Sequence, residues 1–157
     1  MKGRCTCGQL RYELAARPLF THCCHCRWCQ RETGAAFVLN ALIEAENLVS
    51  TGEIEVIDTP SDSGNGQLIH RCPECKVAVW SVYSGAGADF LFVRVGTLED
   101  PDGCPPDIHI YTESKQPWVV LDDGKPVCAQ YYRRSQMWPA ASIARREAVI
   151  ARRGGGR

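Results

Sequence analysis

The chain is dominated by short stretches in which apolar and polar side chains alternate, a pattern typical of strands with one buried face. Leu10, Tyr12 and Leu14, for example, share one face of the stretch 8–14. Similar alternation or continuous apolar runs predict further strands at 36–43, 53–58, 77–82, 89–95 and 108–112. We therefore expect a mainly β fold.

Two segments of the chain contain mostly turn-forming residues. One is 100–107, which is rich in Asp, Pro and Gly, and the other is 59–66, which holds nothing else. Because the second segment is followed by another strand-like stretch, we expect 67–72 to return antiparallel to 53–58 as a hairpin.

Only the C-terminal end has the composition of a helix. Pro139 suits a first helical position, and the stretch 140–153 is rich in Ala and Arg. The Arg-rich composition favours a solvated amphipathic end. The sequence thus divides into a β domain at 1–138 and a C-terminal helix with a basic tail at 139–157.

Length and composition fit a single folded domain. The chain has 157 residues, of which 45% are apolar and 23% charged, and this composition excludes a disordered protein. No run approaches the roughly 18 consecutive apolar residues of a membrane span, and the first eight residues lack an apolar signal region. We therefore expect a cytoplasmic protein with no membrane partner.

Charge is balanced overall but unevenly distributed. Residues 133–157 hold seven Arg and one Glu, a charge of +6, while the formal net charge of the whole chain is zero. Residues 1–132 therefore carry −6. An acidic main body argues against a nucleic-acid partner.

Ten cysteines are the strongest compositional signal. They make up about 6% of the chain, below the roughly 8–10% typical of short disulfide scaffolds. Cys104 and Cys128 have no partner at chelating spacing and are expected to be ordinary small residues. Seven others form three closely spaced groups, which favours metal binding over disulfides. These groups are Cys5 with Cys7, then Cys24, Cys26 and Cys29, and then Cys72 with Cys75.

The first and third groups are expected to form one closed metal site. Residues two apart in an extended chain point to the same side, so Cys5 and Cys7 can face one ion. Cys72 and Cys75 span the two-residue turn of a zinc knuckle, which Pro73 stiffens. Four thiolates give a tetrahedral structural zinc site, with a redox dithiol or plain buried thiols as the alternative.

The middle group leaves three thiols on one short segment. Cys26 and Cys29 can share a first helical turn, whose amide N–H groups stabilise thiolates. Three protein ligands leave a fourth coordination position open, as in catalytic zinc sites. The alternative is that Cys23 or His25 closes this second site, although adjacent residues in a strand point apart.

Taken together, the three groups resemble the glutathione-dependent formaldehyde-activating (GFA) family, also called the centromere protein V/GFA domain. The motifs are C-x-C-G at Cys5-Thr6-Cys7-Gly8, C-H-C-x-x-C at 24–29 and C-x-x-C at 72–75. The later stretch 109–115 with Trp118 is also similar, so the resemblance covers Lys2 to Trp138. One departure is Lys76, where family members usually carry Gly.

The resemblance implies a tent-like arrangement of zinc-bound antiparallel sheets. It also implies two zinc ions per chain, with a structural ion on the first and third groups and a catalytic ion on the middle group. The family's activity joins glutathione to formaldehyde to give S-(hydroxymethyl)glutathione, and the enzyme is classed as a carbon–sulfur lyase by the reverse reaction.

A zinc ion with three thiolates carries a net negative charge, which suits a soft thiol ligand better than the generation of hydroxide. We expect the substrate thiol to take the open position near an electrophilic carbon.

Arg27 and Arg31 are candidate contacts for the carboxylates of glutathione, with ordinary surface charge as the alternative. Spacing alone assigns no role to His25, His109, Lys115 or Trp118.

A non-catalytic interpretation competes with the enzyme. A zinc-stabilised β scaffold could serve as a binding module, and an enzyme acting on another thiol or small electrophile is a third possibility. The discriminating feature is the open coordination position, which only an enzyme of this kind requires.

Overall fold

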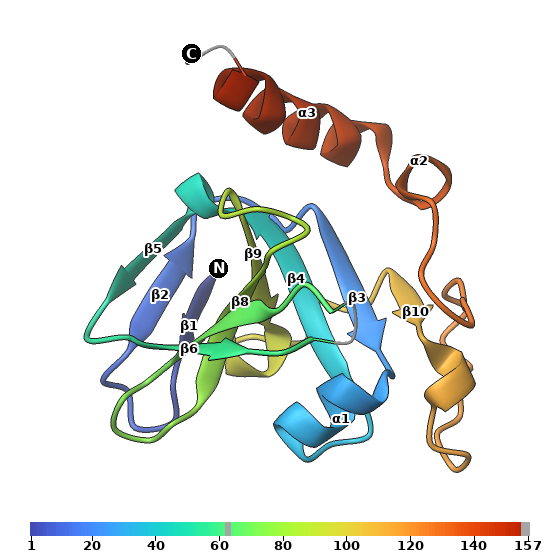
Figure 1. Ribbon diagram of the computed structural model, residues 1–157, viewed down its shortest axis with the longest axis horizontal. Coiled ribbons are helices and arrows are strands. Elements are labelled where there is room, and N and C mark those ends of the chain that lie inside the picture. The colour runs from blue at the N-terminus through green and yellow to red at the C-terminus, as the bar shows by residue number, and fades with distance from the viewer. Residues whose placement is uncertain (62–63, 155–157) are drawn as a thin grey trace.

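The computed structural model describes residues 1–61 and 64–154 and is built around two β-sheets. The strands are β1 (Lys2–Arg4), β2 (Arg11–Leu14), β3 (Phe20–Cys24), β4 (Val38–Glu44), β5 (Leu48–Thr51), β6 (Glu55–Thr59), β7 (Gln67–Arg71), β8 (Ala78–Tyr83), β9 (Phe90–Arg94) and β10 (Ile108–Ile110). The larger sheet has the order β10-β3-β4-β9-β8-β7-β6, and the smaller one has the order β1-β2-β5 (Figure 1).

Helices are few and short, apart from the last one. They are α1 (Arg27–Thr33), α2 (Arg134–Met137) and α3 (Ala140–Gly154), with 3-10 turns at Ala45–Asn47, Val95–Thr97 and Thr112–Ser114. Among the described residues, no helix is both long enough and apolar enough to cross a bilayer. The mainly β fold with a C-terminal helix is therefore confirmed.

The predicted hairpin is also confirmed. Strands β6 and β7 pair antiparallel with Asp58 opposite Leu68. Residues 62–63 of the connecting turn lie outside the described residues. Every strand pair but one is antiparallel; the exception is β10, which lies parallel to β3.

Helix α1 contradicts the expectation that only the end of the chain is helical, although a helical turn at Cys26 and Cys29 was expected. The Cys26 sulfur caps the helix by accepting a hydrogen bond from the Cys29 amide, at 3.4 Å. Gly34 ends the helix in the left-handed conformation with a φ of 65°, which glycine adopts without strain. Seven residues are too few to show a helical hydrophobic period, so the pattern gave no signal here.

Alternation along β4 divides the core into two layers. Ala41 and Ile43 face the smaller sheet and pack with Leu10, Tyr12 and Leu14 of that sheet. On the other face, Phe20, Val38, Leu42 and Phe90 of the sheet pack with Trp138 and Val149 of the C-terminal segment. The larger sheet is therefore covered on both faces.

Helix α3 is docked on the protein, which differs from the expected solvated end. Arg145 forms two hydrogen bonds with the Glu44 carboxylate, at 2.8 and 2.6 Å. Burial opposes ionisation of Glu44, but these hydrogen bonds outweigh it and hold the pKa of Glu44 below its usual value. Arg152 and Arg153 form further ion pairs with Glu46 and Asp89. Much of the basic charge of this segment therefore faces acidic groups of the protein.

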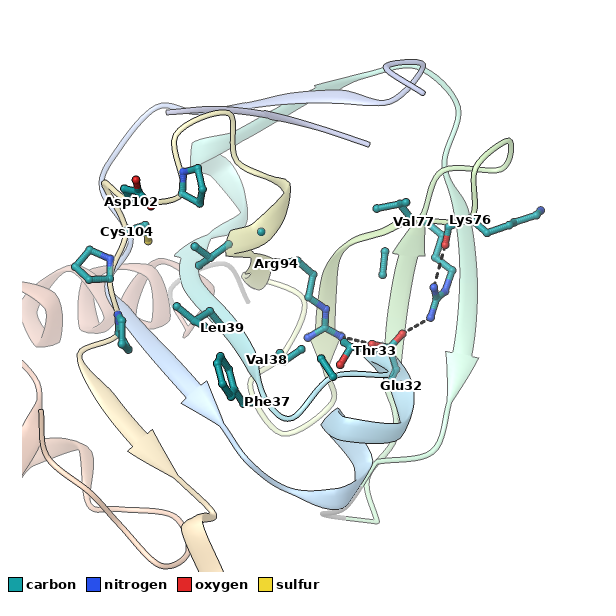
Figure 2. A pocket seen from close by; sticks show the side chains of 18 residues that line it. Glu32, Thr33, Phe37, Val38, Leu39, Lys76, Val77, Arg94, Asp102 and Cys104 are labelled. Atoms are coloured by element: carbon teal, nitrogen blue, oxygen red, sulfur yellow. Dashed lines mark hydrogen bonds and ion pairs between the residues drawn. The ribbon is translucent and has the colours of Figure 1, made fainter. Parts of the chain in front are cut away.

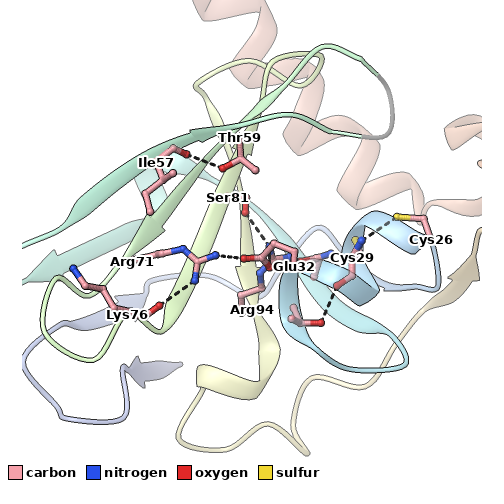
Figure 3. Close-up of polar contacts among 11 residues, drawn as sticks. Cys26, Cys29, Glu32, Ile57, Thr59, Arg71, Lys76, Ser81 and Arg94 are labelled. Carbon is pink, nitrogen blue, oxygen red and sulfur yellow. Dashed lines mark hydrogen bonds and ion pairs between the residues drawn. The ribbon is translucent and has the colours of Figure 1, made fainter.

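Helix α1 is tied to the larger sheet by a buried carboxylate. Glu32 accepts a hydrogen bond from Arg94 of β9 at 3.1 Å and another from Arg71 of β7. Arg94 also donates to Asn40 and to Ser81, the latter at 3.2 Å. Figure 3 shows Glu32 between the two guanidinium groups, on the helix that carries Cys29. This network fixes the position of α1 over the sheet.

We predict that Glu32→Gln lowers the free energy of unfolding by about 3–5 kcal/mol, because it leaves the Arg94 guanidinium, 8% exposed, without a countercharge. Urea denaturation followed by tryptophan fluorescence measures the change. Glu13→Gln removes an exposed carboxylate from β2 and is expected to change stability by less than about 0.5 kcal/mol. Equal stabilities of the two variants would contradict the prediction.

Candidate functional site

The sulfurs of four cysteines, two after β1 and two after β7, meet in one cluster. The Sγ atoms of Cys5, Cys7, Cys72 and Cys75 all lie within 4.8 Å of one another. The Cys5–Cys7 and Cys7–Cys72 sulfur separations are 3.4 and 3.6 Å. Tetrahedral zinc with bonds of about 2.3 Å requires sulfurs about 3.8 Å apart, so these four thiols fit the ion.

Two turns of the backbone create this cluster. The Cys5 amide donates to the Leu10 carbonyl at 2.9 Å, and the Leu10 amide donates to the Cys5 sulfur at 3.3 Å. The Lys76 amide donates to the Cys72 carbonyl at 2.9 Å. Hydrogen bonds from the backbone amides of Cys7 and Val77 lower the pKa of Cys75 to about 6, so the cluster favours a thiolate.

Lys76, at the position where family members usually carry glycine, lies in the turn directly after Cys75. Its φ is 60°, in the left-handed region where most residues other than glycine are strained. The turn is nevertheless closed, and the Lys76 ammonium lies 3.0 Å from Glu55 while its carbonyl accepts from Arg71 at 3.0 Å. Cys72 and Cys75, which precede Lys76, both place their sulfurs in the cluster.

The three cysteines of the middle group form a second, buried cluster. Cys24 ends β3, Cys26 caps α1 and Cys29 lies in its first turn, with all three sulfurs within 4.8 Å of one another. All three are free thiols. Hydrogen bonds from the Cys24 and Cys29 thiols, together with the amides of Cys29 and Trp28, lower the pKa of Cys26 to about 3. The trio therefore suits a thiophilic cation such as zinc.

A cavity of about 360 Å³ opens directly on this trio. Its volume lies within the range of small-molecule sites. Residues of the larger sheet and residues after 130 both line this cavity. The lining residues include His22, Cys24, Cys26, Cys29, Asn40, Tyr83, Phe92, Tyr111, Tyr131, Arg134, Trp138 and Arg146.

The cover of the cavity is anchored to β3 by a buried polar contact. The Tyr132 hydroxyl accepts a hydrogen bond from Trp138 Nε1 at 2.6 Å and lies 2.6 Å from His22 Nε2. Burial lowers the pKa of His22 to about 4, so this imidazole is neutral. Trp138 stacks on Phe20 at 5.5 Å between ring centroids. The C-terminal segment is thereby held over the three thiols.

Two guanidinium groups line the cavity. Arg134 lies over the Trp138 ring at 5.2 Å and Arg146 over the Phe90 ring at 5.7 Å. Within residues 1–61 and 64–154, neither takes part in an ion pair, in contrast to Arg145, Arg152 and Arg153. Sequence reasoning did not single them out, because their proximity to the thiols depends on how the C-terminal segment docks.

Arg27 and Arg31 lie elsewhere. Both are exposed, and Arg27 donates to Gln30 at 2.8 Å. Neither lines the cavity over the trio. Their contact with glutathione stays a prediction that this arrangement does not favour.

A larger hollow of about 750 Å³ lies beside the Glu32 network, but none of the seven clustered cysteines lines it. Figure 2 shows Glu32 and Arg94 meeting there, with Phe37, Val38 and Leu39 along its wall. Cys104 also lines this hollow, and its sulfur lies 3.4 Å from the Thr21 hydroxyl. The larger hollow therefore lacks the clustered thiols that line the cavity over the trio.

A third group of potential ligands was not expected. Cys23, His25 and His109 place one sulfur and two ring nitrogens within 4.8 Å of one another, and all three side chains are buried.

Lys115 donates to the carbonyls of Gln116 and Val119, at 3.1 and 2.6 Å. Trp118 is 71% exposed. Neither Lys115 nor Trp118 lines the cavity over the trio.

Comparisons with known proteins identify the family of this chain. The sequence model described as glutathione-dependent formaldehyde-activating enzyme matches residues 1–114. A crystal structure of a Rhodobacter sphaeroides protein has a TM-score of 0.50 at 17% identity over 82% of this chain and 99% of that chain, a likeness of fold alone. No curated protein sequence matches significantly. Because the matched residues cover more than half of the chain and include all seven clustered cysteines, the chain belongs to the glutathione-dependent formaldehyde-activating family, which supports a function of that general kind.

Proposed function

We propose that the protein is a zinc-dependent carbon–sulfur lyase that joins glutathione, or a similar anionic thiol, to formaldehyde at the three-cysteine cluster. The observation that carries the proposal is the cavity over Cys24, Cys26 and Cys29, which has room for a small ligand and opens on their sulfurs. The cluster of Cys5, Cys7, Cys72 and Cys75 supplies four ligands and so suits a closed structural ion.

Zinc held by Cys24, Cys26 and Cys29 would supply a soft Lewis acid that lowers the pKa of an incoming thiol. In the addition, the thiol loses its proton and its sulfur lone pair forms a bond with the carbonyl carbon. The C=O π bond breaks, and the oxygen takes up a proton to give the hydroxymethyl group. Tyr83 and Tyr131 line the same cavity, and burial raises the pKa of both phenols. They therefore remain O–H donors that can face the developing oxyanion.

Substrate binding is assigned to the two guanidinium groups in the cavity. Arg134 and Arg146 have no ion-pair partner among the described residues, and both line the space beside the thiols. Burial and the neighbouring, exposed Arg134 lower the pKa of Arg146, as expected for a partly buried cation beside a second cation. A carboxylate of glutathione would neutralise this charge through bidentate hydrogen bonds.

The proposal is tested by NMR exchange spectroscopy on a mixture of glutathione and formaldehyde. The protein is expected to accelerate exchange between free and adduct signals beyond the rate in buffer with an equal amount of zinc salt. The comparison matters because the adduct also forms spontaneously. A rate equal to this control, from protein that retains its zinc, would favour the non-catalytic binding module instead.

Variants of the two arginines refine the same test. Arg134→Gln and Arg146→Gln are each expected to raise the KM for glutathione by about 10-fold or more, the value of one charge-assisted hydrogen bond. The rate with 2-mercaptoethanol, which lacks carboxylates, should not change. Arg27→Gln serves as the control on the exposed face of α1. An effect confined to Arg27→Gln would reverse the assignment of the carboxylate contacts.

A further inference from the structure

We propose that Cys23, His25 and His109 form a third metal site, which is separate from the two cysteine clusters. Cys23 Sγ lies 3.5 Å from His25 Nε2, and His25 Nε2 lies 3.2 Å from His109 Nδ1. Tetrahedral zinc with bonds of about 2.3 Å to sulfur and about 2.0–2.1 Å to nitrogen requires separations of about 3.6 and about 3.3 Å. The observed separations match both edges.

The register of the larger sheet brings these three residues together. In the parallel pairing of β10 with β3, His109 lies opposite Cys23, so both side chains point to the same face. His25 follows Cys23 by two residues and continues on that face. Cys24 points to the other face, where it lines the cavity. The backbone of β3 therefore separates the third group from the trio.

A carboxylate supports His109 from outside the group. His109 Nε2 lies 2.9 Å from an oxygen of Asp123, which accepts a hydrogen bond from Nε2–H and leaves the Nδ1 lone pair directed at the other ligands. Metal-bound histidines in proteins commonly have this carboxylate partner on the second nitrogen. The amide of His109 donates to the Pro126 carbonyl at 2.9 Å, and its carbonyl accepts from the Cys128 amide at 2.9 Å. The backbone of β10 at His109 is thus paired with the segment 126–128.

Burial distinguishes the group from a surface cluster. The exposed fractions of Cys23, His25 and His109 are 2%, 0% and 5%. The converging atoms can hydrogen-bond to one another, at 3.5 and 3.2 Å, but one thiol and two imidazoles so deeply buried also form a ligand set for a cation. A metal ion at their centre would satisfy the sulfur and both converging nitrogens.

The donor set indicates the class of ion. One thiolate and two imidazoles suit an ion of intermediate softness, for which Zn²⁺ is the choice that demands no redox chemistry. Such an ion would link β3 to β10, which has three residues and lies at the edge of the sheet. Through Asp123 it would also fix the segment 115–127. The three protein ligands leave the fourth coordination position to a small ligand such as water. We assign the site the role of joining β10 to β3 at this edge.

The proposal is tested by ¹¹³Cd NMR of the full-length protein after its metals are exchanged for cadmium. The cadmium resonance shifts strongly with the number of sulfur ligands, so sites with four, three and one sulfur are resolved from one another. The expected spectrum contains a resonance typical of one sulfur with two nitrogens. Its absence from protein that retains the four-sulfur resonance would overturn the proposal. A missing three-sulfur resonance would instead count against the proposed function alone.

Three variants locate the signal. His109→Gln and Cys23→Ser are each expected to remove the one-sulfur resonance and to leave the four-sulfur resonance in place, which also shows that the variant is folded. His70→Gln, which alters a histidine stacked on Trp80 away from the group, should retain all signals. Asp123→Asn is expected to weaken cadmium binding at this site by about 10–100-fold in chelator competition. A one-sulfur resonance that persists in His109→Gln would also overturn the assignment.

Discussion

Cys26→Ser is expected to remove the metal of the three-cysteine cluster and to lower the rate of glutathione–formaldehyde exchange by at least about 100-fold, to the level of buffer with zinc salt. Cys26 is the best choice among the three because its sulfur is central to the cluster. Hydrogen bonds from Cys24 and Cys29 converge on it and lower its pKa to about 3. Serine is also a good helix cap, so the hydroxyl can still accept from the Cys29 amide and α1 should persist.

Metal content by mass spectrometry and the exchange rate are measured on the same samples. Cys128→Ser is the matched control, because Cys128 is a half-buried thiol outside all three groups of potential ligands. The variant Cys26→Ser is expected to lose one metal equivalent per chain relative to this control. Retention of every metal ion would show that Cys26 is not a ligand, and full activity without the ion would refute the catalytic assignment.

The cysteine groups were predictable from sequence because their chemistry is local. Two residues in an extended segment, or two residues around a short turn, place sulfurs side by side whatever the rest of the fold does. Cys5 with Cys7 and Cys72 with Cys75 are such pairs, and the structure brings them together as expected. The prediction that Cys23 points away from Cys24 also follows from strand geometry, and the structure agrees.

Contacts that depend on distant pairing were not predictable in the same way. His109 reaches Cys23 only because β10 adds to the edge of the sheet parallel to β3, and nothing in the local sequence specifies that neighbour. The segment 131–146 lines the cavity because two contacts hold it in place. Trp138 donates to Tyr132, and Arg145 donates to the buried carboxylate of Glu44. Composition alone favoured a solvated end, because a helix rich in Arg has the same pattern whether its cations face water or acidic groups. The division at 138 stays a prediction, since the matched family sequence ends at 114.

Cys72→Ser is expected to abolish cooperative folding rather than activity alone. Cys72 is fully buried, and its cluster joins the N-terminal turn to the turn after β7, 65 residues later. Apparent binding free energies of structural zinc in small domains are about 10–16 kcal/mol, as large as the whole stability of a typical domain at about 5–15 kcal/mol. Loss of one of four ligands should therefore remove most of the net stability.

The measurement is urea denaturation followed by the fluorescence of the buried Trp80, which packs in the same core layer as Cys5 and Cys72. Cys104→Ser alters another buried cysteine of that layer outside the metal clusters, and it is expected to cost only about 1–3 kcal/mol. Cys26→Ser should retain a cooperative transition, because its cluster lies in the other core layer. A Cys72→Ser protein that unfolds at the midpoint of the wild type would show that the four-cysteine cluster holds no structural ion. If Cys26→Ser unfolded while Cys72→Ser did not, the structural and catalytic roles of the two clusters would have to be exchanged.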